Sequence, residues 1–368
     1  MLTTMTLTAR RYSYLAPVLL ALLVGYLIIY PLLPNTSAAK IFSFTQMFML
    51  IALASNWNLI GGFTGYVDFG HAVFFGLGAY TVGILMAQPW FVNIAAALVE
   101  PFSAEIAGNV RQLAIYTFAL SLPFAGIVAS IFSQLIGIPT LRLRGPYFSI
   151  AMLGTFVVMR EVIRVSKPLT GGGVGLNLTP YLNRPLFYYG MLALTVLIVG
   201  LMWWIRRSEF GASLIAIRED EVGAEMRGIN TTAHKLVAFG VAAFFTGLVG
   251  GIWAFQNTFI DPDIVFIERR TVDMVMMSML GGLGTVAGPV VGAAVIYWLR
   301  DIVWANLGDY HLMVQGMVLI TIVLFMPEGI VGYFDKTGTS IQKVMGKWVG
   351  SKLPAKQNEM PKEAVHEQ

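Results

Sequence analysis

Long apolar runs, separated by short polar segments, make up most of the chain. A helix that crosses a bilayer needs roughly 20 mostly apolar residues, and each of the longer runs is near that length. The pattern therefore predicts an all-α integral membrane protein, a polytopic helical bundle with about eight to ten transmembrane helices. The runs expected to cross as single helices are residues 14–33, 41–62, 112–141, 147–163, 186–205, 236–257 and 312–333.

Glycine interrupts two further apolar segments, residues 61–83 and residues 271–299. Glycines at this density let helices pack closely, or they break a helix where protein or a water-filled cavity covers the freed backbone groups. Residues 271–299 are longer than one straight span and shorter than two, so we expect a broken or re-entrant pair of short helices. One break in each half of the chain fits an inverted repeat around a central pathway. The glycines expected near that pathway are Gly70, Gly76, Gly281, Gly282 and Gly284.

One strongly polar segment, residues 206–235, lies between two apolar runs. Asp220 stands where a residue would cap a short helix, and Gly228 stands where a glycine would end it. Val222 and Met226 lie four residues apart and would form an apolar ridge on a helix over residues 220–227. Such a ridge is typical of a helix that docks into a groove on a soluble partner. The alternative is a solvated loop. The residues expected at the docking surface are Arg218, Glu219, Asp220, Glu221, Val222, Glu225, Met226 and Gly228.

The composition indicates that most of the protein surface faces membrane lipid rather than water. Charged residues are 12% of the chain and hydrophobic residues are 57%, whereas soluble domains are about a quarter charged. The net charge of +4 does not indicate nucleic-acid binding, because Lys and Arg in a membrane protein mainly mark the cytoplasmic loops.

The distribution of charge predicts which segments face the cytoplasm. The basic groups at 10–11, 142–144, 206–235 and in the tail fall on one side, and the acidic loops 93–111 and 258–270 fall on the other. Two arginine pairs, Arg160 with Arg164 and Arg269 with Arg270, violate the pattern.

The chain ends follow from this arrangement. Residues 1–13 are expected in the cytoplasm, residues 14–333 form a single membrane domain, and residues 334–368 form a disordered cytoplasmic tail. The first apolar run also has an alternative interpretation as a signal peptide, although it is longer than the usual apolar core of one.

Ionisable residues inside apolar segments are costly and are by default functional candidates. Asp68 and His71 lie three residues apart and would share one helical face. They would line or gate the pathway, or hold the broken helix by hydrogen bonds; the alternative is that they are solvated at a membrane edge. Asp273 is a similar case that lies closer to a predicted external loop.

No catalytic or metal-binding signature occurs in the sequence. The absence of cysteine excludes disulfides and thiol catalysis, and the four histidines lack the spacing of metal ligands. No phosphate-binding loop of the kind that holds ATP is present. The chain is therefore not expected to be an enzyme or to hold a cofactor or metal of its own.

Six segments carry a family resemblance. They are NWNLIGGFTGYVDFGHAVFFGLGAY (Asn56–Tyr80), TLRLRGPYFSIAMLG (Thr140–Gly154), LTGGGVGL (Leu169–Leu176), FGASLIAIREDEVGAEMRGIN (Phe210–Asn230), IDPD with VDMVMMSMLGGLGTVAGPVVGA (within Ile260–Ala293) and LFMPEGIVG (Leu324–Gly332). In this order they extend over nearly the whole chain from the second predicted span onward. They resemble the permease subunits of branched-chain amino acid ATP-binding cassette (ABC) importers, the LivM type.

The resemblance implies half of a membrane pathway in a bacterial or archaeal cytoplasmic (inner) membrane. A LivH-type sister permease, or a second copy of this chain, would supply the other half. Two ATPase subunits would bind ATP and dock on residues 206–235, where Ile217–Asn230 resembles the coupling helix. A periplasmic or lipoprotein binding protein would deliver branched-chain or other neutral amino acids.

Other functions stay open at this point. Where Asp68 stands, the family commonly has a small hydroxyl residue, and Thr271-Val272-Asp273 replaces an expected Ser-Ile-Glu. The substrate is therefore not determined, and relatives of this family carry urea and short amides. A stand-alone secondary carrier or channel that uses Asp68 and His71 is an alternative from another class.

Overall fold

The computed structural model describes residues 22–34, 36–101, 106, 109–181, 183–307, 313, 316–317, 320–321 and 329–333. Secondary structure in these residues is almost entirely helical. The strands among them are β1 (Leu176–Asn177) and β2 (Phe259–Ile260), which pair antiparallel. The prediction of an all-α membrane protein is confirmed. The N-terminal residues 1–13, the tail 334–368 and most of the predicted last span lie outside the described residues.

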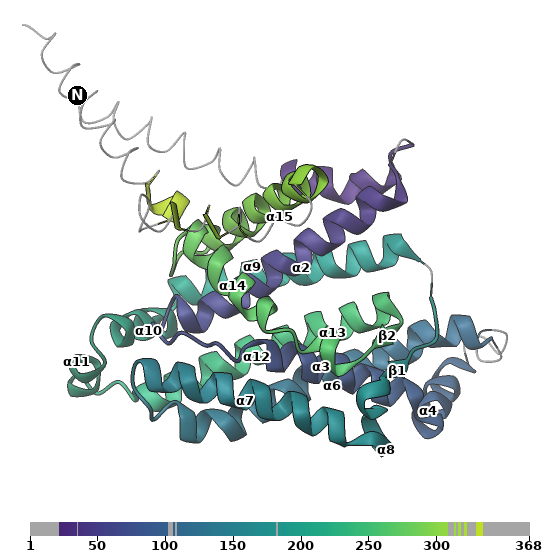
Figure 1. Cartoon of the computed structure of the whole chain (residues 1–368), viewed down its shortest axis with the longest axis horizontal. Helices are drawn as coiled ribbons and strands as arrows, with labels where there is room; N and C mark the ends of the chain where they lie inside the picture. The colour runs from purple at the N-terminus through teal and green to yellow at the C-terminus, as the bar shows by residue number, and fades with distance from the viewer. Residues whose placement is uncertain are drawn as a thin grey trace, which may run out of the picture.

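A bundle of long helices forms the body of the molecule, and these helices run between its two ends (Figure 1). α12 lies at the centre, where it packs against α6, α3 and α2. Because nearly every position is apolar, the central helices are buried on most sides. The long helices are α2 (Ala38–Gly61), α3 (Ala72–Ala87), α6 (Val110–Thr140), α7 (Pro146–Val165), α9 (Arg184–Arg207), α12 (Thr231–Asn257) and α15 (Ala287–Leu307).

Small polar residues set where four of these helices begin. Each accepts a hydrogen bond from a backbone N–H in the first turn of its helix, which satisfies a donor that has no partner within the helix. These N-cap residues are Ser37 of α2, Asn109 of α6, Asn183 of α9 and Asn230 of α12.

Short elements close the two ends of the bundle. α10 (Glu209–Glu219) and α11 (Glu221–Met226) lie at one end, and β1 and β2 lie at the other (Figure 1). The remaining short elements are η1 (Tyr30–Leu32), α4 (Pro89–Val99), α8 (Lys167–Thr170), η2 (Gly172–Val174) and α13 (Pro262–Val265).

Both predicted breaks are present. Residues 62–71 separate α2 from α3, and α14 (Glu268–Gly281) is separated from α15 (Ala287–Leu307) by a turn that begins at Gly282 with φ of 127°. The prediction of a helix break within residues 271–299 is confirmed, but the second helix, α15, has 21 residues and extends beyond residue 299. An inverted relationship between the two halves stays a prediction.

One expectation about spans needs correction. The acidic loop expected at 93–111 begins as helix, because α4 follows α3 after a bend of 76°. Among the described residues, four helices are long and apolar enough to cross a membrane, or five if the bent pair is one span. This count covers only the described residues and does not contradict the expected eight to ten spans; α7 and the two helices of the broken element are not among these candidates. The predicted spans 14–33 and 312–333 lie partly outside the described residues.

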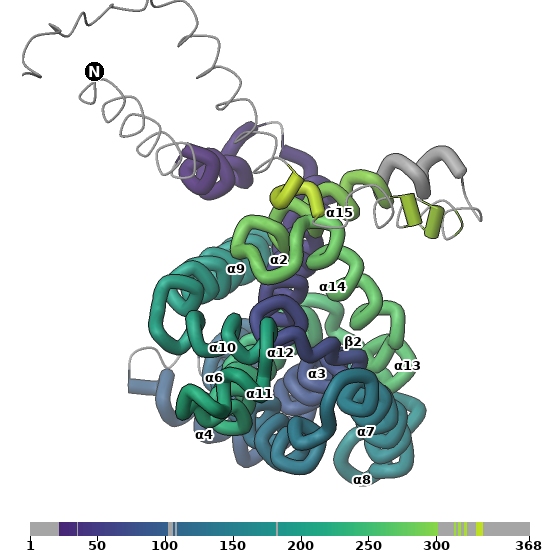
Figure 2. The backbone as a smooth tube through the Cα atoms, turned by 90° about the vertical axis from the view of Figure 1, so that its left-hand side faces the viewer, coloured from purple at the N-terminus to yellow at the C-terminus, as the bar shows by residue number. Residues whose placement is uncertain are grey.

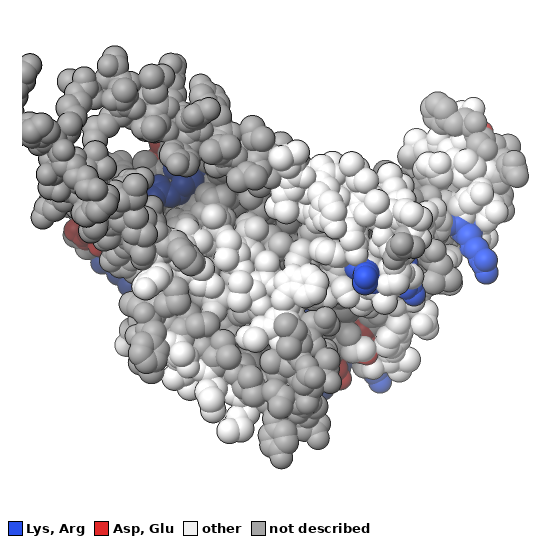
Figure 3. Space-filling view, turned by 90° about the horizontal axis from the view of Figure 1, so that it is seen from above, with Lys and Arg blue, Asp and Glu red and all other residues white. Residues whose placement is uncertain are grey.

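Charged side chains lie mainly at the ends of the bundle. The arginines that violated the charge pattern on α7 pair with acids near the β1–β2 end, because Arg160 and Arg164 both contact Asp263. Arg160 also contacts Glu268. The face on the α15 side, seen from above in Figure 3, carries few charged side chains in its middle. Such a face suits lipid or another apolar helix.

Candidate functional site

The polar segment 206–235 folds into two short helices at one end of the bundle. α10 and α11 lie in front of the ends of the long helices in Figure 2. Ser208 caps α10 by accepting a hydrogen bond from the backbone N–H of Gly211. The sequence predicted α11 within residues 220–227 but did not predict α10.

α11 begins and ends where expected, with one correction. Asp220 occupies the N-cap position in an extended conformation, but its carboxylate accepts no capping hydrogen bond. The predicted side-chain cap is therefore wrong. Gly228 follows the C-cap with φ of 85°, a left-handed conformation that favours glycine and ends the helix as predicted.

The outward side of α11 carries the predicted apolar ridge. Val222 is 53% exposed and Met226 is 85% exposed. Single exposed apolar residues are ordinary. These two, however, lie four residues apart on a short helix among charged residues, which matches the anchor spacing of a helix that fills a partner's groove.

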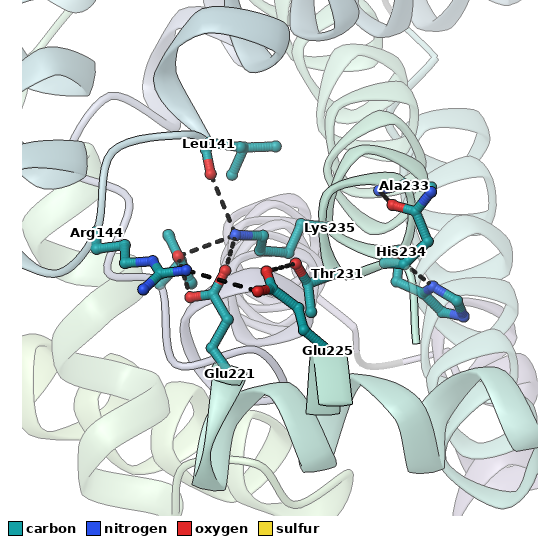
Figure 4. A network of polar contacts seen from close by, with 10 residues as sticks. Leu141, Arg144, Glu221, Glu225, Thr231, Ala233, His234 and Lys235 are labelled. Atoms are coloured by element: carbon teal, nitrogen blue, oxygen red, sulfur yellow. Dashed lines mark hydrogen bonds and ion pairs between the residues drawn. The ribbon is translucent and has the colours of Figure 1, made fainter. Parts of the chain in front are cut away.

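The opposite side of α11 is anchored to the bundle by a buried ion pair (Figure 4). Nζ of Lys235, in the second turn of α12, donates to Oε1 of Glu221 at 2.6 Å and to the backbone oxygen of Leu141 at 3.1 Å. The Tyr66 hydroxyl donates to Oε2 of Glu221 at 2.6 Å and accepts from Lys235 at 2.9 Å. The Lys235 side chain is only 2% exposed and that of Glu221 17%. Glu221 was expected on the docking surface and instead points into the molecule.

This network sets the ionisation of Glu221. Burial by itself raises the pKa of the carboxyl, but hydrogen bonds from Lys235 and Tyr66 more than offset burial and hold that pKa below its ordinary value. Because the folded-state pKa is lowered, the ionised carboxylate stabilises the fold at neutral pH. That contribution is lost as the pH falls through the folded-state pKa.

Glu225 makes a second, weaker connection on the same helix. Its Oε1 accepts a hydrogen bond from the Thr231 hydroxyl at 2.9 Å, and its Oε2 lies 3.8 Å from the guanidinium of Arg144 (Figure 4). Exposed ion pairs of this kind contribute about 0–1 kcal/mol. The contact nevertheless places the basic turn after α6 at the same end as α11, as the charge pattern predicted.

Arg218 connects α10 with both glycine breaks, a role the sequence did not predict. Its Nη1 donates to the backbone oxygen of Gly62 at 2.8 Å and lies against Gly284, where an added Cβ would be 2.3 Å away. The Asn58 amide completes the connection, because it donates to the backbone oxygen of Thr285 at 2.8 Å and accepts from the Gly284 N–H at 3.0 Å. The last turn of α2 is therefore hydrogen-bonded to the second break, and Arg218 of α10 is hydrogen-bonded to the first residue after α2.

Asp68 and His71 are fully buried, so the alternative of a solvated pair is wrong. Nδ1 of His71 lies 2.9 Å from Oδ2 of Asp68, and its Nε2 lies 3.0 Å from the hydroxyl of Thr246 on α12. Oδ1 of Asp68 accepts from the Gly70 N–H at 2.8 Å, and Gly70 itself packs against the backbone of α7. The pair thus holds the first break against the bundle. A role in the pathway stays a prediction.

Replacing Asp68 by alanine is expected to lower the melting temperature of the purified protein in detergent. The change leaves His71 and the Gly70 N–H without their partner, at a cost of about 1–3 kcal/mol for each buried group. The matched control is Asp220→Ala, because that carboxylate makes no capping bond and its loss should leave the melting temperature unchanged. Equal melting temperatures for the two variants would contradict the structural role of Asp68.

The remaining residues that were predicted near the pathway lie at contacts between helices. Gly76 faces the ring of Phe266, and Gly281 packs against the other arm of the broken element. Asp273 forms an ion pair with Arg300 of α15, and its side chain is 10% exposed, so a solvated position is wrong for it as well. Among the residues that the structure describes, no group of three His, Asp or Glu side chains is placed to hold a metal ion.

Comparison with known proteins identifies the family. The model of the family "branched-chain amino acid transport system / permease component" matches residues 38–323. The chain is 24% identical over 344 residues to the high-affinity branched-chain amino acid transport system permease protein LivM of Salmonella typhimurium, a match that covers 85% of this chain and 74% of that protein. LivM of Escherichia coli matches to the same extent.

A second group of relatives has a different name. The chain is 27% identical over 304 residues to the autoinducer 2 import system permease protein LsrC of Yersinia pseudotuberculosis, which covers 77% of this chain and 75% of that protein. No solved structure matches the chain. Because the family model covers most of the sequence, the chain belongs to the family of permease components of branched-chain amino acid transport systems, of the LivM type.

Proposed function

We propose that the chain is a membrane-spanning permease subunit of an ABC importer for branched-chain or other neutral amino acids. Two ATPase subunits bind and hydrolyse ATP, and one of them docks on α11. A second permease, of LivH type or a copy of this chain, completes the pathway in the inner membrane, and a separate binding protein delivers the substrate.

One observation carries this proposal: α11 presents an exposed ridge on one side and is anchored on the other. The ridge of Val222 and Met226 suits a groove on a soluble subunit. The buried ion pair of Glu221 with Lys235 connects α11 to α12. A displacement of α11 by a bound partner would therefore be transmitted to α12. Arg218 extends the same route to the glycine breaks.

The substrate proposal depends on the relatives. The LivM relatives are named for branched-chain amino acids, and their matches cover more of this chain than the LsrC match does. An importer of urea or short amides is the alternative within the same class. A stand-alone carrier is less well supported, since Asp68 and His71 are already hydrogen-bonded to each other and to Thr246.

Replacing both Val222 and Met226 by aspartate is expected to abolish copurification of the ATPase subunit and substrate-stimulated ATP hydrolysis. The change puts two charges into the apolar groove that the ridge would fill, and a charge that is buried without a partner is costly. Because both side chains are exposed, the variant should insert and purify like the unaltered chain.

The matched control is Val174→Asp, an 84% exposed valine in η2 at the opposite end of the molecule. This variant should retain the ATPase subunit. Undiminished copurification of the ATPase with the double variant would overturn the docking role of α11. Uptake driven by an ion gradient in vesicles that contain the purified chain alone would overturn the importer itself.

A further inference from the structure

α9 packs on the bundle with one side only. It lies at the edge of the bundle beside α2 (Figure 2), and its buried residues, among them Met191, Ile198 and Ile205, follow a single stripe along the helix. The helix is long and apolar enough to cross a membrane. Its opposite, exposed stripe therefore meets either lipid or another protein.

The exposed stripe changes its chemistry in the last turns of α9, next to α10. Leu197 is aliphatic and 54% exposed, whereas Trp203 and Trp204, two turns later, are 51% and 62% exposed. Arg206 and Arg207 follow, and both are exposed. Aliphatic residues, then tryptophan, then arginine is the order found where a lipid-facing helix leaves a bilayer, because indole rings lie at the level of the headgroups and guanidinium groups extend to the water.

The two arginines form a positively charged pair that the described part of the chain does not neutralise. The guanidinium carbon of Arg207 lies 4.0 Å from the ring centroid of Trp203, a cation–π contact that holds it beside the indole. No carboxylate of the described residues forms an ion pair with Arg206 or Arg207. Two adjacent positive charges at this level attract a negatively charged partner.

The adjoining tryptophans favour a lipid over a soluble acidic protein as that partner. Trp203 lies four residues before Arg207, which is about 6 Å along the helix axis toward the apolar part of α9. A soluble protein that covered both residues would have to enter the membrane. A phospholipid offers both chemistries at the matching depths, since its phosphate binds guanidinium through paired N–H···O bonds and its acyl chains pack against indole rings.

We infer that the α10 end of α9 binds an anionic phospholipid, with the phosphate held by Arg206 and Arg207 and the upper acyl chains packed against Trp203 and Trp204. The inference goes beyond the proposed importer function and does not depend on it. The site directly precedes Ser208, which caps α10, so a bound lipid lies beside the start of the segment that carries α11.

The test measures how brominated lipids quench the tryptophan fluorescence of the assembled complex in nanodiscs. The chain has eight tryptophans, so the signal of Trp203 and Trp204 is obtained by comparison with the variant Trp203→Phe/Trp204→Phe. Brominated phosphatidylglycerol should quench these two indoles more than brominated phosphatidylcholine does at the same mole fraction. In Arg206→Gln/Arg207→Gln the preference for phosphatidylglycerol should fall about fivefold for each arginine removed.

The matched control is Arg184→Gln, which removes an exposed arginine at the opposite end of the same helix; it should keep the preference for phosphatidylglycerol. Equal quenching by the two lipids, or an unchanged preference in Arg206→Gln/Arg207→Gln, would overturn the inference. Quenching by neither lipid would overturn it as well, because it would show that another protein covers this end of α9. Copurification of the ATPase subunit tests the importer proposal separately, so that proposal stands or fails independently of these outcomes.

Discussion

Lys235→Met is expected to lower the stability of the protein by about 3–5 kcal/mol and to abolish coupling to ATP hydrolysis. Removing one partner of a buried ion pair leaves an uncompensated charge in the interior, and losses of this size are typical. Here the carboxylate of Glu221 would lose its 2.6 Å partner, and the backbone oxygen of Leu141 would lose a donor. Thermal unfolding in detergent and substrate-stimulated ATP hydrolysis measure the two effects.

Two variants make this experiment decisive. Arg144→Met removes a cation at the same end that forms an exposed pair at 3.8 Å, and it should cost at most about 1 kcal/mol. Lys235→Met combined with Glu221→Gln removes both charges, so it should be more stable than Lys235→Met alone. If the double variant is no more stable, the two side chains are not energetically coupled and the anchoring role is wrong.

Acid should reduce the difference between Lys235→Met and the unaltered protein. In the unaltered protein, the lowered pKa of Glu221 means that its stabilising contribution is present at neutral pH and is lost as the pH falls through that pKa. In the variant, protonation of Glu221 removes the buried charge that has no partner. Melting temperatures of the two proteins, measured from pH 7 downward, should therefore converge.

Gly78→Ala is expected to abolish the yield of folded protein, although alanine is the better helix former by about 1 kcal/mol. An added Cβ on Gly78 would lie 2.0 Å from the backbone oxygen of Gly247, so α3 and α12 would have to separate. Overpacking of a core costs about 1–3 kcal/mol and more where the neighbour cannot move. A backbone atom in the central helix of the bundle is such a neighbour.

The control for this change is Gly154→Ala on α7. That glycine is also within a helix, but an added Cβ would meet nothing within 4 Å, so helix propensity alone should decide and the yield should stay equal or rise. The measurement is the monodisperse fraction in size-exclusion chromatography. Equal yields of the two variants would show that close contact between α3 and α12 is not required.

Local patterns in the sequence predicted the elements whose causes are local. Length and apolarity are enough to place most of the long helices, and Gly228 is enough to place the end of α11. The two glycine breaks were also predicted, since no packing arrangement is needed to recognise them. α10 was not predicted, because its helix lies among charged residues and begins at a cap formed by Ser208.

Orientation was harder to predict because it depends on distant residues. Glu221 points inward only because Tyr66 and Lys235, far from each other in the sequence, meet beside α11. Asp220, a good capping residue by type, makes no cap. Arg300 lies outside every motif that the sequence offered, although an arginine so near an apolar run was a detectable signal.

The bonds of Asn58 and Arg218 have a consequence for how the elements that they join can separate. The Asn58 amide donates to the backbone oxygen of Thr285 and accepts from the Gly284 N–H, and these two bonds join residues more than 200 positions apart. A third bond, from Arg218 to the backbone oxygen of Gly62, joins residues 156 positions apart. A state that separates α2 from residues 284–285 must lose both bonds of Asn58, at about 1 kcal/mol each. A partial separation of these elements would break hydrogen bonds before the elements can move independently. We therefore expect intermediate arrangements to be poorly populated. Accordingly, we expect α2 and the second break to separate in one step rather than gradually.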